Sequence, residues 1–145
     1  MVLSTLALAT TLVAADTKKL GPPPDPTLHV FRETLDGGAE QVIANSLERP
    51  AFVSKLRERL RAQASELRRG DYPDPIGSGK TPSIATLRAR ASHMTIAYAD
   101  IPRGGEIRFV SKDAALIAAL HDWMAATVRV NQKEHPGGGP GEGGE

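Results

Sequence analysis

The sequence predicts an α+β fold built from two β-hairpin–helix units and a short linking helix, in the order ββα-α-ββα. Residues 29–67 and 93–128 each read as a strand, a glycine-containing turn, a second strand and an amphipathic helix. The same order of signals therefore occurs twice. Each unit is too small to bury its apolar face alone, so we expect a four-stranded, mainly antiparallel sheet with the helices on one face.

The bulk composition limits the classes of protein to which this chain can belong. Its 145 residues suit one domain, and 40% hydrophobic but only 4% aromatic residues predict a core of leucine, isoleucine, valine and alanine. With 18 basic and 17 acidic residues the net charge is +1, which does not indicate a nucleic-acid-binding surface. The absence of cysteine excludes disulfides, thiolate nucleophiles and cysteine-ligated metals.

The N-terminal segment has the pattern of a secretory signal peptide. Residues 2–15 are uncharged and mostly apolar, and Val13-x-Ala15 fits the small-residue rule for cleavage before Asp16. The run is shorter than the roughly 20 residues that a membrane-spanning helix needs. No Lys or Arg precedes it, so a buried N-terminal helix or strand is the alternative. We predict a signal peptide at 1–15, a periplasmic or secreted protein, and no membrane span after signal removal.

A proline-rich linker at 16–27 separates this segment from a single α+β domain at 28–134. Four prolines between positions 22 and 26 remove amide donors and exclude a helix or a central strand there. The tail at 135–145, HPGGGPGEGGE, has no apolar residue to bury and is expected to be disordered.

The first unit begins with predicted strands at 29–34 and 39–44, joined by a Leu-Asp-Gly-Gly turn at 35–38. A helix follows at 50–69, and Gly70 ends it. The basic excess on this helix is interleaved with acids, so we interpret it as a solvated face rather than a phosphate-binding one. Its apolar stripe has helical spacing and consists of Phe52, Val53, Leu56, Leu60, Ala64 and Leu67.

A loop at 71–80 and a short helix at 82–91 lead to the second unit. Its strands are predicted at 93–99 and 106–111, with a turn at 100–105. The final helix is predicted at 113–130, with an apolar stripe that consists of Leu116, Ile117, Leu120, Trp123, Met124 and Val128.

The two units align when Gly37-Gly38 is placed on Gly104-Gly105. The aromatic Phe31 then falls on Tyr98. A three-residue slip after the second strand places the two helical stripes on each other, so that Phe52, Val53, Leu56 and Leu60 match Leu116, Ile117, Leu120 and Met124. A true duplication and a chance similarity between two hairpin–helix units both stay open, and the α+β prediction depends on neither.

The segment 77–81, GSGKT, has the ending of a phosphate-binding P-loop. That motif needs Gly, four residues and then Gly-Lys-Ser/Thr, after a buried strand. Position 74 is Asp instead of Gly, and the preceding DYPDP is polar and broken by proline. We therefore interpret the segment as an ordinary loop rather than a nucleotide site.

Four histidines, His29, His93, His121 and His135, lack any spacing that by itself indicates a metal site. Ordinary surface or hydrogen-bonding roles are the alternative for each of them. We select His121 as the best candidate for a ligand or a proton carrier, because it lies beside the carboxylate of Asp122 and near Trp123, the one tryptophan.

Asp71 and Asp74, with Tyr72 between them, form the one compact acidic cluster predicted to lie in a loop. Paired carboxylates can perform acid–base chemistry or bind a hard cation. Aspartates in a proline-rich loop also form turns, which is the alternative. No Gly-x-Ser-x-Gly motif is present.

Four segments carry a family resemblance: His-Val-Phe with the Asp-Gly-Gly turn, Arg-Gly-Asp-Tyr-x-Asp-Pro at 69–75, Ile-x-Tyr-x-Asp-Ile-Pro-x-Gly at 96–104, and Ala-Leu-His-Asp-Trp at 119–123. Residues 29–123 thus resemble a group of small exported bacterial proteins of unestablished function, often labelled aspartate carbamoyltransferase. The chain lacks the length and the Ser-Thr-Arg-Thr-like phosphate loop of a carbamoyltransferase, so we do not expect that activity. Relatives often carry a His-Gly and a Met-Pro-Gly near the loop where this chain has IGSGKTPS.

Three functions are compatible with these patterns. The favoured one is a non-enzymatic, exported binding or accessory domain for an unknown small ligand or metal ion near His121 and the loop at 70–81. The second is a small enzyme with His121 and Asp71 or Asp74 as the acid–base pair. The third is a protein–protein module that uses a sheet face or edge. No catalytic residue or cofactor is assigned, and the candidate ligand residues are His29, Asp71, Tyr72, Asp74, His121 and Trp123.

Overall fold

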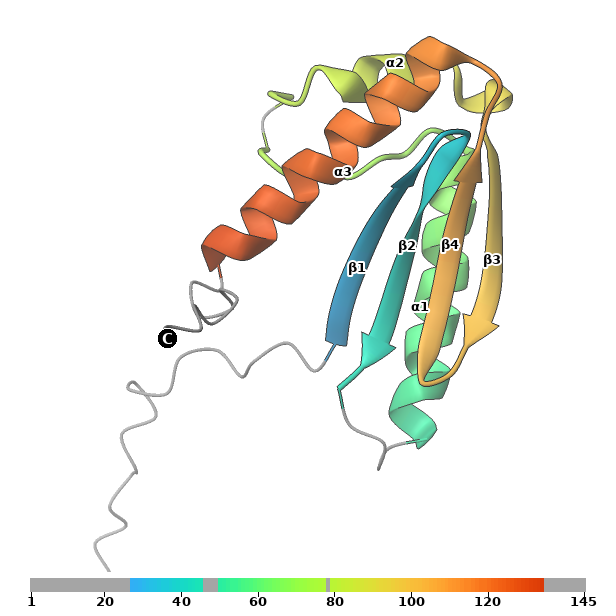
Figure 1. Ribbon diagram of the computed structural model, residues 1–145. Coiled ribbons are helices and arrows are strands. Elements are labelled where there is room, and N and C mark those ends of the chain that lie inside the picture. The colour runs from blue at the N-terminus through green and yellow to red at the C-terminus, as the bar shows by residue number, and fades with distance from the viewer. Residues whose placement is uncertain (1–26, 46–49, 78, 135–145) are drawn as a thin grey trace, which may run out of the picture.

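A four-stranded antiparallel sheet with the strand order β1-β2-β4-β3 forms the centre of the fold (Figure 1). The computed structural model describes residues 27–45, 50–77 and 79–134. The strands are β1 (Thr27–Thr34), β2 (Gly37–Ala44), β3 (Thr95–Ile101) and β4 (Gly104–Val110). The helices are α1 (Pro50–Arg68), α2 (Ser83–Ala89), the 3-10 helix η2 (Ala91–His93) and α3 (Ala114–Glu134). The predicted α+β fold with two ββα units is confirmed.

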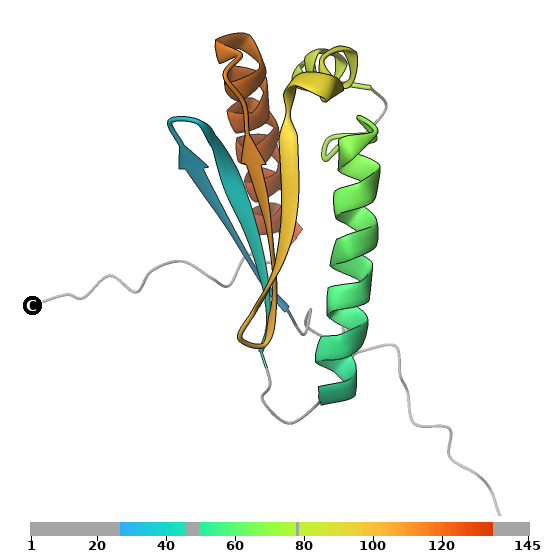
Figure 2. The same cartoon turned by 90° about the vertical axis from the view of Figure 1, so that its right-hand side faces the viewer.

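The two long helices cover the same face of the sheet but different halves of it. Helix α1 packs mainly on β3 and β4, whereas α3 packs on β1 and β2 and also contacts α2. In two perpendicular views α1 and α3 stand apart from each other (Figures 1 and 2). The core lies between these helices and the sheet, and its largest fully buried side chains are Trp123, Phe109, Leu67, Leu87, Ile107, Leu116, Leu120, Met124 and Val42.

The hairpin turns are shorter than the sequence suggested. Leu35-Asp36 and Pro102-Arg103 alone form the turns, and Gly37 and Gly104 already belong to strands. These glycines are required by close packing of β2 on β4. A Cβ atom at Gly37 would lie 2.0 Å from the carbonyl oxygen of Phe109, and one at Gly104 would lie 1.8 Å from that of Val42. Arg103, with φ of 62°, takes the positive-φ position after a turn proline.

The predicted third strand began two residues too early. His93 ends η2, and β3 starts at Thr95 because the 3-10 turn holds the backbone, with the amide of His93 donating to the carbonyl of Arg90. β1 and β3 lie at opposite edges of the sheet. His29 on β1 and His93, just before β3, therefore lie near opposite edges of the sheet.

The two ββα units are related by an approximate two-fold axis through the β2–β4 ladder. Gly38 pairs with Phe109, and Val42 pairs with Gly105, so equivalent positions of the two units exchange roles across the ladder. Glu40 pairs with Ile107, its own equivalent, at the centre of this arrangement. The sequence alignment of the two units thus corresponds to the packing of the sheet.

Some predicted segments lie outside the described residues. These are the signal peptide at 1–15, all but the last residue of the linker at 16–27, and the tail at 135–145. Within the described ranges, none of the helices combines the length and apolar character needed to cross a membrane.

Candidate functional site

His121, the leading candidate from the sequence, ties α3 to the first hairpin. Its Nε2 lies 2.7 Å from the carbonyl oxygen of Gly37, and its Nδ1 lies 3.8 Å from the carboxylate of Glu33. The other unit has the same arrangement at equivalent positions. There Arg57 donates through Nε to the carbonyl of Gly104 at 3.0 Å and lies 3.8 Å from Asp100. His121 thus fastens α3 to the β1–β2 hairpin, and we call its contact with Gly37 the α3 clasp.

Trp123 connects α3 to the loop that follows α1. The indole is 1% exposed and donates through Nε1 to the carbonyl of Pro73 at 2.9 Å. The ring of Tyr72 meets it edge to face, with centroids 5.3 Å apart. Burial raises the pKa of Tyr72 to about 12, so its phenol stays neutral. The hydroxyl of Tyr72 is enclosed and has no hydrogen-bond partner among the described residues.

The two loop aspartates have local partners. Asp74 accepts a hydrogen bond from the hydroxyl of Thr81 at 2.5 Å and further ones from the amides of Ile76 and Gly77. These bonds, that from Thr81 first, lower the pKa of Asp74 and shape the loop around it. Asp71 is exposed and lies 3.5 Å from Arg69. Hydrogen bonds of these aspartates do not extend to His121.

A polar trio lies under α1 and consists of Glu40, His29 and Gln63, of which the sequence singled out His29 alone. Glu40 on β2 is only 3% exposed, although it carries a carboxylate. It accepts a hydrogen bond from the amide of Gln63 on α1 at 3.0 Å, and its other oxygen lies 3.4 Å from Nδ1 of His29 on β1. The hydroxyl of Thr27 lies 3.2 Å from Nε2 of the same imidazole. Three elements thus hold one buried carboxylate.

Comparison of the two units shows what is unusual about this trio. The positions of Glu40 and His29 are occupied in the second unit by Ile107 and Ile96, which are 0% and 5% exposed. By the helix alignment, the position of Trp123, 1% exposed, is taken in α1 by an exposed arginine, Arg59. The second unit therefore has apolar side chains at three core positions where the first unit has a carboxylate, an imidazole and a guanidinium.

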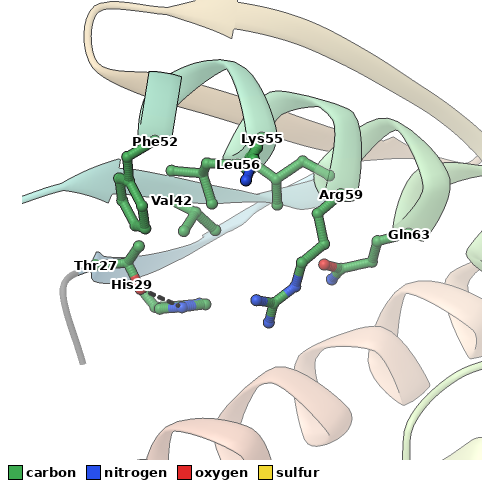
Figure 3. Close-up of a pocket in the computed structure, with 9 residues that line it drawn as sticks. Thr27, His29, Val42, Phe52, Lys55, Leu56, Arg59 and Gln63 are labelled. Carbon is green, nitrogen blue, oxygen red and sulfur yellow. Dashed lines mark hydrogen bonds between the residues drawn. The ribbon is translucent and has the colours of Figure 1, made fainter. Parts of the chain in front are cut away.

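These residues border a hollow of about 240 Å³ between α1 and the β1–β2 hairpin (Figure 3). The apolar wall consists of Val42, Phe52, Leu56 and Leu60, and the polar wall of Thr27, His29, Lys55, Arg59 and Gln63. Arg59 extends from α1 into the same opening as the ring of His29 (Figure 3). Glu40 lies behind this wall, bonded to two of its members.

A second, more open hollow of about 530 Å³ adjoins the first and shares Arg59 and Gln63 with it. It brings in Asp71 and Tyr72 from the loop, together with Arg88. Three sequence candidates, His29, Asp71 and Tyr72, therefore border one or other of two hollows that share Arg59 and Gln63. Neither hollow is lined by Asp74, His121 or Trp123.

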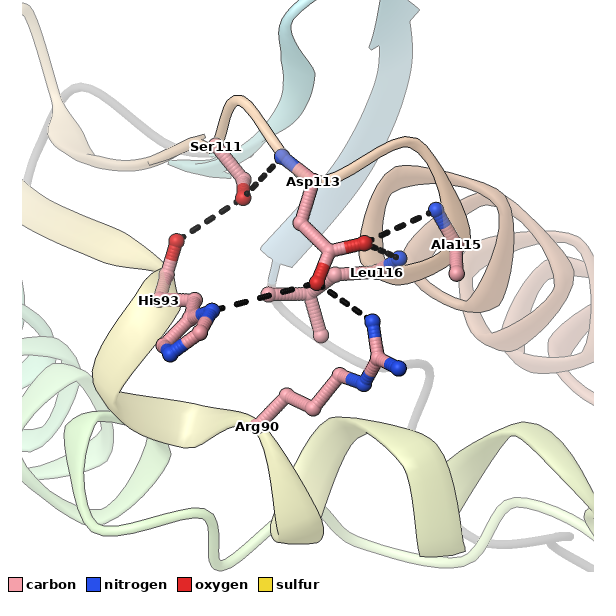
Figure 4. A network of polar contacts seen from close by, with 6 residues as sticks. All are labelled: Arg90, His93, Ser111, Asp113, Ala115 and Leu116. Atoms are coloured by element: carbon pink, nitrogen blue, oxygen red, sulfur yellow. Dashed lines mark hydrogen bonds and ion pairs between the residues drawn. The ribbon is translucent and has the colours of Figure 1, made fainter.

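The polar network at the opposite end of the sheet caps a helix (Figure 4). Asp113 accepts hydrogen bonds from the amides of Ala115 and Leu116, at 3.0 and 3.3 Å, and from Arg90 at 2.6 Å. The Arg90 bond, followed by the amide bonds, lowers the pKa of Asp113. Asp113 caps the start of α3, and the hydroxyl of Ser111 donates to the carbonyl of His93 at the end of η2, so we assign this network to folding.

No three His, Asp or Glu side chains of the described residues are grouped closely enough to hold a metal ion. Comparison of the chain with protein-family models, with curated proteins and with solved structures found no match. The functional inference therefore rests on the residues and their geometry. The sequence alone did not reveal Glu40 and Gln63 because Glu40 sits in an ordinary strand pattern. The alignment of the two units, which places a glutamate on an isoleucine, was the one available signal.

Proposed function

We propose that this chain is a small-ligand-binding domain whose site is the hollow between α1 and the β1–β2 hairpin. The observation that carries the proposal is Glu40, a carboxylate that is 3% exposed at the position where the other unit buries Ile107. A buried carboxylate costs stability, and an apolar residue is the usual solution at such a position. A polar trio beside an open hollow therefore fits a binding site better than a packed core.

The elements that build the site support a rigid receptor. His29 and Glu40 come from paired strands, and Gln63 comes from a long helix packed on the sheet. Side chains held by such elements keep their geometry before a ligand arrives, which lowers the entropic cost of binding. The hollow has the mixed lining of small-molecule sites, an apolar wall with a few polar groups.

A fragment screen by two-dimensional NMR tests this function. The full-length chain is exposed to equal numbers of neutral, cationic and anionic fragments, and perturbed amide signals are mapped. We expect perturbations that saturate and cluster on β1, β2 and α1. The variant Glu40→Gln should change the affinity of the bound fragments, whereas His121→Ala, which removes only the α3 clasp, should leave it unchanged. Absence of saturable binding by fragments of every class would refute the proposal.

One observation favours a second candidate function, general-base catalysis. His29 lies between the hydroxyl of Thr27 and the carboxylate of Glu40, at 3.2 and 3.4 Å. With Nδ1 protonated, the imidazole donates to Glu40 and accepts from Thr27, the order in which a carboxylate orients a base toward a nucleophile. Hydrolysis of a small activated ester by the chain, lost in His29→Ala, would identify this activity; equal rates in the two proteins would remove it.

We further propose that the domain acts in the periplasm or outside the cell. This proposal rests on the signal-peptide pattern of residues 1–15. The helix-free sheet face, where Leu28 and Val30 are 53% and 40% exposed, is the surface open to a protein partner.

A further inference from the structure

We propose that the ligand of the hollow is a small organic carboxylate with an apolar body, an inference that rests on the proposed function. Its carboxylate group meets Arg59 and Lys55 at the mouth, and its apolar body lies along the wall formed by α1 and β2. The inference follows from the charges at the mouth, from the apolar wall and from an unsatisfied hydroxyl next to Arg59.

The mouth of the first hollow carries uncompensated positive charge. Lys55 and Arg59 both line it, and neither forms an ion pair with any acidic residue of the described chain. Two other arginines of the same helix differ. Arg57 and Arg61 both interact with Asp100, at 3.8 and 3.0 Å. Two unpaired cations one helical turn apart, facing one opening, favour an anion there.

Glu40 does not oppose this charge at the surface of the hollow. The carboxylate is not part of the lining, and its two oxygens face His29 and Gln63, which stand between it and the opening. The adjoining hollow is different because acidic side chains line it as well, Glu66 and Asp71 beside Arg59 and Arg88. The positive excess is therefore confined to the first hollow.

The apolar wall distinguishes an organic anion from an inorganic one. Phe52 and Val42 form it together with Leu56 and Leu60. A phosphate or sulfate ion would leave this wall in contact with water, whereas a short alkyl or aromatic body would cover it, which is favourable by about 25 cal/mol per Å² of apolar surface. The volume of about 240 Å³ suits a body of this size.

The hydroxyl of Tyr72 supplies an independent indication of a ligand. The side chain is 2% exposed, and the hydroxyl has no partner among the described residues, although buried donors are nearly always satisfied. Tyr72 lines the adjoining hollow, next to the two residues that both hollows share, Arg59 and Gln63. A carboxylate bound by Arg59 offers the phenol an acceptor once the side chains that enclose the hydroxyl move aside.

Calorimetric titration of the full-length chain with three sets of probes tests the inference. The carboxylates are benzoate and hexanoate, the neutral analogues benzamide and hexanamide, and the cations benzylamine and hexylamine; acetate and inorganic phosphate test for anions without an apolar body. We expect the two apolar carboxylates to bind best, with an affinity that falls as salt is added. The variants Arg59→Gln and Lys55→Gln should weaken binding about tenfold each, since each removes a charge-assisted contact.

The control variant is Arg108→Gln, which removes one positive charge from an exposed site on the helix-free face. It should leave the dissociation constants within about twofold of the original values, because the sheet separates it from the hollow and it is exposed to solvent. Tyr72→Phe should weaken carboxylate binding without loss of thermal stability, since the hydroxyl it removes has no partner.

The outcomes separate the two proposals. Equal or tighter binding of the neutral or cationic analogues, unaffected by Arg59→Gln, would overturn the carboxylate assignment and leave the binding function in place. Phosphate binding as tight as that of benzoate would overturn the role of the apolar wall. No heat of binding from any probe, together with no saturable fragment in the NMR screen, would remove both.

Discussion

Asp113 shows at the scale of one residue how a polar cluster can serve folding alone. One carboxylate accepts from two amides at the start of α3 and from Arg90, and His93 lies 3.9 Å away. Asp113 stands directly before the amphipathic helix α3, where aspartate is a preferred capping residue. Glu40 gave no such signal, because its partners come from β1 and α1 and are brought to it only by the fold.

The lowered pKa of Asp113 makes its contribution to stability depend on pH. The folded state favours the ionised carboxylate, so the stabilisation is present above the ordinary pKa of 3.8 and is lost as the pH falls through the lower folded value. We expect Asp113→Ala to lower the melting temperature at neutral pH, and the difference from the original chain to shrink between about pH 5 and pH 2. Thermal scans across this range test it, with Asp113→Asn as a cap that does not ionise. A difference that stays constant down to pH 2 would exclude the ionised form as the cause.

At the scale of elements, spacing in the sequence was sufficient to predict the helices and strands, and insufficient to place their ends. The apolar stripe of α1 reappears as buried Leu56, Leu60, Ala64 and Leu67. The predicted turns are too long because glycine pairs are typical of turns, whereas here close strand contact requires Gly37 and Gly104. One side of α1 is not covered by α3, because the two helices stand apart on the sheet. This follows from how the elements pack together, and no local sequence pattern predicts it.

Trp123 holds the loop after α1 against α3, and its removal should loosen that loop. Trp123→Phe keeps an aromatic ring but loses the hydrogen bond to Pro73 and part of the buried volume. We expect a loss of about 1–3 kcal/mol in the free energy of unfolding. Denaturant unfolding measures the loss, and amide hydrogen exchange at 71–77 measures the loop. Phe31→Leu, which removes another ring partner of the same tryptophan, is the control and should leave loop exchange unchanged.

At the scale of the whole molecule, two similar units have different tasks. The hairpin, the helix and the clasp recur, with Arg57 on Gly104 in one unit and His121 on Gly37 in the other. The polar trio and the hollow do not recur, because Ile96 and Ile107 occupy two of the trio positions in the second unit. Stability is therefore expected to come mainly from the second unit, and binding from the first.

Substitutions that give one unit the residue found at the equivalent position of the other test this division between stability and binding. Glu40→Ile should raise the free energy of unfolding by about 1–2 kcal/mol, because it replaces a buried carboxylate with the residue of the other unit. It should also abolish fragment binding in the hollow. Ile107→Glu, the reverse change, should destabilise the chain by about 3 kcal/mol or more, since no His or Gln is placed to receive that carboxylate. Urea unfolding of both variants measures these differences, and a destabilised Glu40→Ile would mean that the trio serves the fold.

The β2–β4 ladder also determines when the chain can fold. It pairs Gly37 with Val110 and Ile43 with Gly104, so the centre of the sheet joins segments that are synthesised far apart in time. A nascent chain that has completed β1, β2 and α1 still has one edge of β2 unpaired and most of the surface for α1 missing. Such long-range pairing slows folding and leaves an edge open to other chains until β4 arrives. Commitment to the native state therefore comes late in synthesis, and the receptor half acquires its shape only after the half that does not bind has been made.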